Sequence, residues 1–210
     1  LKQGQQRVPD SLLMVRLEGS LYQSQDDKEK VETFYENIFL QYPEETVFLL
    51  DRARWHWSKA RPNKALQDLE TLFKLDPENF EAHYLAGLIR IGIGEDEKAL
   101  ENLIKAGSLQ DGHAEIWSHI ANLWNRLGEP EKARAAIRKA LELAPESYPY
   151  LQQYVNYLEA RLDTHQSETI AELRVTLKQL MWLESEDSWV LAHSGSVSYT
   201  HLTLPTTLLV

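Results

Sequence analysis

The stretch "AEIWSHIANLWNRLGEPEKARAAIRKALELAPES" (Ala114–Ser147) decides the fold of this 210-residue chain, because the chain contains it more than once. A shift of 34 residues places it on "FEAHYLAGLIRIGIGEDEKALENLIKAGSLQDGH" (Phe80–His113). Two further shifts of the same length give the blocks 46–79 and 12–45, and no gap is needed. Unrelated amphipathic helices would not keep register over four blocks, so we interpret the stretch as one copy of a repeat.

Small side chains recur at two places of the repeat. They are Gly19, Ala53, Gly87 and Ala121 at the eighth place, and Val31, Ala65, Ala99 and Ala133 at the twentieth. Small residues let two helices approach closely where larger side chains would hold them apart. Each repeat is therefore predicted to be an antiparallel helix hairpin that closes at these two places.

An apolar stripe and flanking prolines define the second helix of each hairpin. The stripe consists of Tyr35, Leu69, Leu103 and Ile137 at the twenty-fourth place, and Ile38, Leu72, Ala106 and Ala140 at the twenty-seventh. Pro62 and Pro130 stand where a helix begins, at a position where the missing N–H costs nothing. The pattern predicts helix pairs at 12–24 with 29–41, 46–59 with 62–75, 80–93 with 96–109, and 114–127 with 130–143.

With its 34-residue period, its small residues and its terminal prolines (Pro43, Pro77 and Pro145), the pattern resembles the tetratricopeptide repeat family. The resemblance implies an all-α fold, a right-handed superhelical α-solenoid of antiparallel helix hairpins. We expect an N-terminal remnant at 1–11 and a repeat array at 12–190, with blocks 12–45, 46–79, 80–113 and 114–147 and an atypical helix pair at 148–190. Within that pair, 148–162 and 167–187 read as helices.

The last residues, 191–210, do not fit the repeat. The segment from Val197 reads "VSYTHLTLPTTLLV", without a charge or a helical period. It resembles the translation of a sequencing adapter, so we expect 191–210 to be a disordered, non-native tail. On that interpretation, the chain is a fragment of a longer protein.

Composition narrows the classes of partner. Asp and Glu outnumber Lys and Arg by 32 to 22, which gives a net charge of −10. Binding to nucleic acid requires a basic surface that displaces counterions from phosphates, and an anionic membrane has a similar requirement. We therefore expect neither partner. The chain has no cysteine, which excludes disulfides and thiolate chemistry but leaves both a cytoplasmic and a periplasmic location open.

No pattern in the sequence predicts catalysis, a cofactor or a metal site. His113 and His119 are six residues apart, whereas a zinc-binding pair on one helix face stands four apart. His56 lies between two tryptophans, where packing explains it. The glycines of "GIGED" (Gly92–Asp96) fit a turn between helices, because the stretch lacks the other residues of a phosphate-binding loop.

The outward face of the first helices remains as a candidate surface. In tetratricopeptide repeats these helices line the concave groove, and the resemblance places a partner-binding groove at Arg54, Trp57, Tyr84, Leu88, Asn122, Asn125 and Arg126. The same register also places Leu50 on this face. An apolar anchor and amides that hydrogen-bond a peptide backbone would suit an extended segment. The alternative for Trp57 and Leu88 is packing between neighbouring repeats.

These features together predict a protein–protein interaction scaffold or adaptor that binds a protein or peptide segment, and not a small-molecule substrate. One alternative is a non-catalytic arm of a larger enzyme, such as a transferase. A second is an RNA-processing scaffold, because "ARAAIRKALELAP" and "YLQQYVNYLEAR" also resemble the half-repeats of that class. The acidic net charge disfavours this second alternative.

Overall fold

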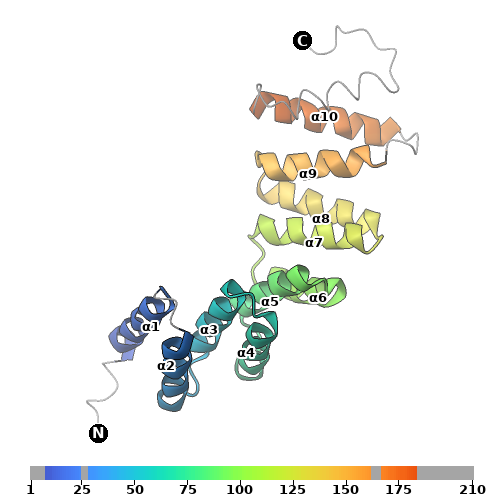
Figure 1. Ribbon diagram of the computed structural model, residues 1–210. Coiled ribbons are helices and arrows are strands. Elements are labelled where there is room, and N and C mark those ends of the chain that lie inside the picture. The colour runs from blue at the N-terminus through green and yellow to red at the C-terminus, as the bar shows by residue number, and fades with distance from the viewer. Residues whose placement is uncertain (1–7, 25–27, 162–166, 184–210) are drawn as a thin grey trace. The chain divides into compact units, whose positions relative to one another are not determined.

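The computed structural model describes residues 8–24, 28–161 and 167–183, and the regular elements in these ranges are all α-helices (Figure 1). They are α1 (Val8–Ser24), α2 (Lys28–Gln41), α3 (Thr46–Ser58), α4 (Pro62–Leu75), α5 (Phe80–Ile93), α6 (Asp96–Leu109), α7 (Ala114–Arg126), α8 (Pro130–Leu143), α9 (Tyr148–Glu159) and α10 (Ser167–Leu183). The predicted all-α fold is confirmed.

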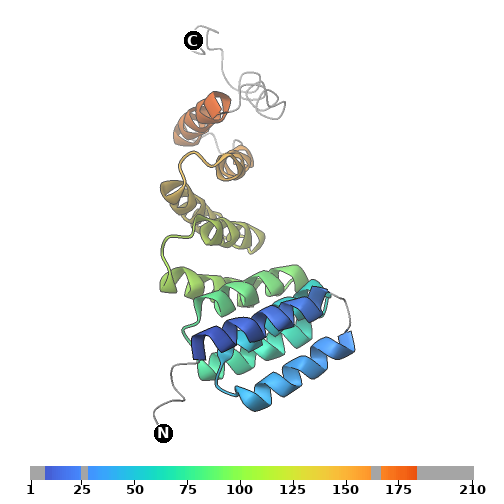
Figure 2. The ribbon, with the colours of Figure 1, turned by 90° about the vertical axis from the view of Figure 1, so that its left-hand side faces the viewer.

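Contacts within the chain divide it into two compact units, unit 1 (residues 1–109) and unit 2 (residues 110–210). Unit 1 contains α1 to α6, and unit 2 contains α7 to α10. Inside each unit, consecutive helices pack in pairs as hairpins, and each hairpin packs on the next (Figures 1 and 2). This is the α-solenoid arrangement that the repeat predicts.

The helix bounds follow the sequence prediction closely. From α2 to α8 every observed end lies within one residue of its predicted position. The first helix begins at Val8, four residues before the first block, and α10 ends at Leu183 within the predicted stretch 167–187. The proposed tail, 191–210, lies outside the described residues.

The two helices of a hairpin approach closely at the small residues. A Cβ atom built on Gly87 of α5 would lie 2.6 Å from Cδ2 of Leu103 in α6, and one on Gly19 of α1 would lie 2.7 Å from the ring of Phe34 in α2. These distances are shorter than a normal van der Waals contact. Ala99, the small residue of α6, is fully buried. The predicted contact between the helices is confirmed.

The apolar stripe of the second helices forms the core. In unit 1 one cluster of buried side chains joins α3, α4 and α5, with Leu69 and Leu72 of α4 fully buried. A second cluster joins α2 to α3 through Tyr35 and Phe48. In unit 2, Ile137 and Ala140 of α8 are buried in the same way. Burial of this stripe therefore stabilises each hairpin and its contact with the next one.

A left-handed backbone conformation closes the turn inside three hairpins. The fifteenth place of the repeat has φ of 78° at Gly94 and 75° at Gly128, but alanine occupies it in the second block, where Ala60 has φ of 55°. Glycine adopts this conformation without steric cost, whereas the Cβ of alanine is strained there. The chain thus contains both the favourable and the unfavourable residue in one type of turn.

We expect Ala60→Gly to raise the free energy of unfolding by roughly 0.5–1 kcal/mol, because relief of strain outweighs the added flexibility of the unfolded chain. Gly94→Ala should lower it by about 1 kcal/mol, although no atom lies within 4 Å of the new Cβ. Urea unfolding of both variants measures the effect. A loss of stability in Ala60→Gly would show that the turn is not strained.

Candidate functional site

The residues predicted to bind a partner lie on the first helices of three hairpins, α3, α5 and α7. In unit 1 they are Arg54, Trp57, Tyr84 and Leu88; in unit 2 they are Asn122, Asn125 and Arg126. The structure therefore brings them together as two sets. A single groove through both sets stays a prediction.

In unit 1, alternating charges connect the first helices α1, α3 and α5. Arg16 of α1 donates two hydrogen bonds to the carboxylate of Asp51 in α3, at 2.7 and 2.9 Å. This hydrogen bonding raises the pKa of Arg16. Arg54 lies 3.7 Å from the same carboxylate and donates to Glu81 of α5 at 2.8 Å. These ion pairs fix the guanidinium groups on this face, and the repeat pattern does not predict them.

A pocket of 220 Å³ opens beside these charges. Its lining consists of Leu13, Arg16, Leu17, Ser20, Gln23, Asp51 and Arg54. The side chains of Leu13 and Leu17 are more than half exposed, while those of Arg16 and Arg54 are 40% and 47% exposed. The pocket thus has apolar walls and two guanidinium groups that are paired with the Asp51 carboxylate, which also lines it.

Trp57 packs between two hairpins. Its half-buried side chain lies against the core of α3, α4 and α5, and a Cβ atom on Gly92 of α5 would lie 2.5 Å from its ring. This is the packing alternative that the sequence left open. The placement of Leu50 on the outward face was wrong, because only 4% of it is exposed and its side chain belongs to the same core.

Tyr84 and Leu88 lie one turn apart on α5 and are both half-buried. The ring of Tyr84 stacks on the ring of Phe80, with centroids 6.2 Å apart and planes 12° from parallel. The two side chains keep part of their surface exposed, which is the geometry of an apolar contact site on a helix face.

In unit 2 the candidate surface is polar. Asn122, Asn125 and Arg126 are exposed on α7, and the helical period places them on one face. Gln153 of α9 donates a hydrogen bond from Nε2 to Oδ1 of Asn122 at 2.8 Å and to the main-chain oxygen of Ser118 at 3.0 Å. Gln153 is not among the residues predicted from the sequence, where its only signal is an amide at the sixth place of the atypical last block.

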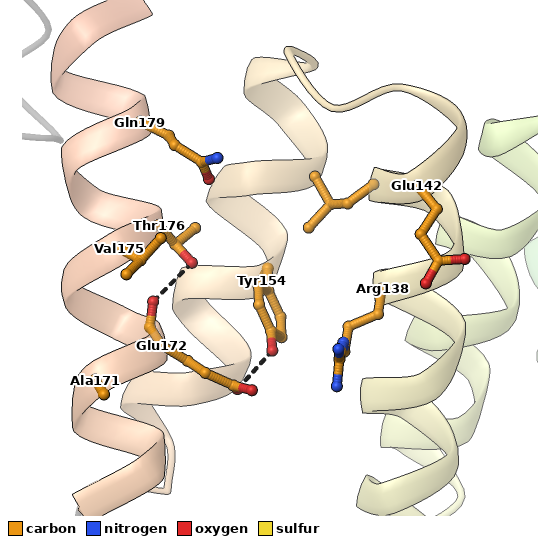
Figure 3. A pocket seen from close by; sticks show the side chains of 9 residues that line it. Arg138, Glu142, Tyr154, Ala171, Glu172, Val175, Thr176 and Gln179 are labelled. Carbon is orange, nitrogen blue, oxygen red and sulfur yellow. Dashed lines mark hydrogen bonds between the residues drawn. The ribbon is translucent and has the colours of Figure 1, made fainter.

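A larger pocket, of 520 Å³, lies between α8, α9 and α10 (Figure 3). Two of its lining residues are bonded to each other, since the hydroxyl of Tyr154 donates to Glu172 of α10 at 2.7 Å (Figure 3). Arg134 of α8, which does not line the pocket, pairs with the same carboxylate at 2.6 Å. Burial raises the pKa of Tyr154 to about 12. These bonds connect three helices through one carboxylate, so we assign them to the attachment of α10.

One polar cluster is buried between α3 and α4. Asp68 pairs with Arg52, and Nε2 of His56 lies 3.8 Å from Oδ2 of the same carboxylate. His56 and Asp68 are each only 4% exposed. Burial lowers the pKa of His56; Asp68 opposes this effect, while Arg52, Lys64 and Arg61 add to it. The burial agrees with the packing role that the sequence predicts for His56.

The described ranges contain no group of three His, Asp or Glu side chains that could hold a metal ion. Of the helices in these ranges, none has the length and apolar content that a membrane crossing requires.

Comparison with protein families gives a match to the model of the tetratricopeptide repeat over residues 50–101 and 97–148. The two matches overlap and together extend from α3 to the start of α9. A comparison with curated protein sequences gives no significant match.

Solved structures share the fold at low sequence identity. MamA from Desulfovibrio magneticus RS-1 is 20% identical with a TM-score of 0.69, over 83% of this chain and 96% of that one. PilF of Pseudomonas aeruginosa is 13% identical with a TM-score of 0.67, over 88% and 81%. YrrB, described as a TPR protein with an unusual peptide-binding site, is 16% identical with a TM-score of 0.64, over 78% and 81%.

The buried His56 predicts a pH-dependent stability. Burial lowers its pKa in the folded chain below the ordinary value of a histidine, about 6.5, so the unfolded chain binds the proton more tightly. The free energy of unfolding should therefore fall as the pH drops below about 6.5, and level off once the folded-state pKa is passed. Urea unfolding between about pH 7.5 and pH 5 measures this.

His56→Gln, which cannot titrate, is the matched variant. Its free energy of unfolding should change less over the same pH interval than that of the parent chain. An equal pH dependence in the two proteins would show that His56 is not the titrating group.

Proposed function

We propose that this chain, which belongs to the tetratricopeptide repeat family, is a protein-interaction scaffold that binds an extended segment of a partner protein along the first helices of its hairpins. The observation that carries the proposal is the polar face of α7, where the side chains of Asn122, Asn125 and Arg126 are exposed to solvent. Amide and guanidinium groups can hydrogen-bond the backbone of a peptide whatever its sequence.

The face of unit 1 complements this chemistry. Tyr84 and Leu88 present apolar surface, and the pocket beside Arg16 and Arg54 combines leucine walls with two guanidinium groups. Aromatic and arginine side chains are the types that most often dominate binding energy at protein interfaces. We therefore assign apolar anchoring of a partner to unit 1 and polar contacts to unit 2.

YrrB provides a parallel, because it shares the fold and is described as having a peptide-binding site. The net charge of −10 favours protein over nucleic acid as the partner. No observation on the described residues favours the enzyme arm or the RNA-processing scaffold, so the interaction scaffold is the function we propose.

The proposal predicts which substitutions weaken binding. Random peptides displayed on phage are selected on the chain, and a selected peptide is synthesised and titrated. Tyr84→Ala or Asn122→Ala should each weaken its affinity by about 1 kcal/mol or more, the usual threshold for an important contact. Asn122→Ala should leave the melting temperature nearly unchanged, because its side chain is exposed and the one hydrogen bond described for it, from Gln153, lies at the surface.

Lys98→Ala is the control. Lys98 lies on the second helix α6, where it is exposed and pairs with Glu95 at 3.1 Å. This change should affect neither affinity nor stability. If Lys98→Ala abolished binding and the first-helix variants were silent, the partner would use another face and the site assignment would fail.

A further inference from the structure

The pocket between α8, α9 and α10 (the α10 pocket) is walled by two second helices, so it is separate from the first-helix residues assigned to the proposed function. We propose that the α10 pocket is a second interaction site. It binds a segment of a partner protein that inserts one apolar side chain and places a carboxylate against Arg138 of α8. Neither site requires the other.

Unit 1 contains the equivalent place, and ion pairs close it. The seventh place of the repeat lines both cavities, as Arg52 in α3 and as Tyr154 in α9. The cavity in unit 1 has a volume of only 140 Å³, against 520 Å³ for the α10 pocket. Arg52 pairs there with Asp68, and Lys64 pairs with Glu32 at 3.2 Å. The cations that line the smaller cavity are therefore already engaged.

In unit 2 a single ion pair bridges the second helices. Arg134 stands at the same twenty-first place as Glu32, and its pair with Glu172 of α10 at 2.6 Å repeats the Glu32–Lys64 pair with opposite charges. Among the residues that the structure describes, Arg134 is the only one of α8 that is bonded to α10. The space beyond this pair, toward the C-terminal end of α8, is not bridged and forms the pocket.

Arg138 is the unpaired cation of the α10 pocket. It stands one turn after Arg134, is exposed, and its side chain points into the gap between α8 and α10 (Figure 3). Within residues 8–24, 28–161 and 167–183 it has no ion pair or hydrogen bond, not even with Glu142 one turn further on. The Glu172 carboxylate is held by Tyr154 and Arg134. The guanidinium group of Arg138 is thus available to a carboxylate from outside, with which it forms charge-assisted hydrogen bonds.

Apolar surface lies beside this guanidinium group. Leu141 of α8 and Ala171 and Val175 of α10 line the pocket, and 59% of Val175 is exposed. Trp182 stands seven residues after Val175, which places it two turns along the same side of α10, and it is 80% exposed. Exposed apolar side chains grouped beside a pocket are typical of an interaction surface. A segment that lies along α10 would contact both Val175 and Trp182.

These groups together specify the class of partner. An apolar side chain of the partner would leave water on entering between Leu141 and Val175, which stabilises the complex. An acidic residue next to it in the partner would reach Arg138. Gln179, whose amide points across the pocket toward α8 (Figure 3), can hydrogen-bond the backbone of the segment. The partner segment is therefore both acidic and apolar.

Peptide selection supplies the probe. Random peptides displayed on phage are selected on the parent chain, and those that also bind Ala171→Trp are removed, because the new indole fills the pocket. Ala171 is exposed, so this variant should fold, and its melting temperature checks that it does. The remaining peptides should share an Asp or Glu close to a large apolar residue. One of them is synthesised and titrated.

Arg138→Glu should weaken the affinity for this peptide at least about tenfold, because it replaces an attractive pair of charges with a repulsive one. Lys178→Glu is the matched control, since it makes the same change of charge at an exposed residue of α10 that does not line the pocket. It should leave the affinity unchanged. Both side chains are exposed, so the melting temperatures should stay close to that of the parent chain.

Peptide variants identify the group that meets Arg138. Each Asp or Glu of the peptide is replaced by the corresponding amide. One replacement should weaken binding to the parent chain, and the same replacement should cost much less affinity for Arg138→Gln, because the two changes remove a single interaction.

The remaining outcomes would overturn the inference. They are a selection without any peptide specific for the open pocket, and a peptide that binds Arg138→Glu as tightly as the parent chain. Self-association of the chain in sedimentation that Ala171→Trp abolishes would mean that a second copy occupies the pocket. Tyr84→Ala and Asn122→Ala should not affect this peptide, so failure of the first-helix site and failure of the α10 pocket are distinguishable. A peptide weakened by those two changes would lie on the first-helix face instead.

Discussion

The close approach of two helices at the eighth and twentieth places of the repeat is the constraint on which the other features depend. At Gly87 and Gly19 the partner helix comes so near that a Cβ atom would lie within 3 Å of a side chain. Where alanine takes these places, as at Ala65 and Ala99, it is fully buried. Because this contact fixes the facing sides of both helices, it also determines which side of each first helix points outward.

The outward sides of the first helices differ between the two units. In unit 1, Arg16, Asp51, Arg54 and Glu81 pair across three helices, and half-buried Tyr84 and Leu88 lie on α5. In unit 2 the exposed groups are amides and a guanidinium, and Gln153 fixes one of the amides. The two outward faces therefore differ in chemistry: the one in unit 1 carries paired charges and apolar surface, and the one in unit 2 is polar.

The helices could be predicted from the sequence because the repeat supplies four aligned copies of each boundary and each core position. Contacts between hairpins could not be predicted in the same way, since they depend on how one hairpin packs on the next. Leu50 was assigned outward from its place in the repeat and is buried in the core of α3, α4 and α5. Gln153 lies in the atypical last block, which does not align with the four repeats, so no equivalent residue in another block points to its role. The seven residues assigned to the groove remain a prediction about binding.

Unfolding of Gly87→Ala tests the central constraint most directly. Alanine is a better helix former than glycine by about 1 kcal/mol, so without a steric conflict this change inside α5 would stabilise the chain. Because the new Cβ would lie 2.6 Å from Leu103, we predict that the free energy of unfolding falls, and that the same change becomes stabilising in a Leu103→Ala background. If Gly87→Ala alone made the chain more stable than the parent, the close approach of α5 and α6 would be contradicted, and with it the assignment of the outward face.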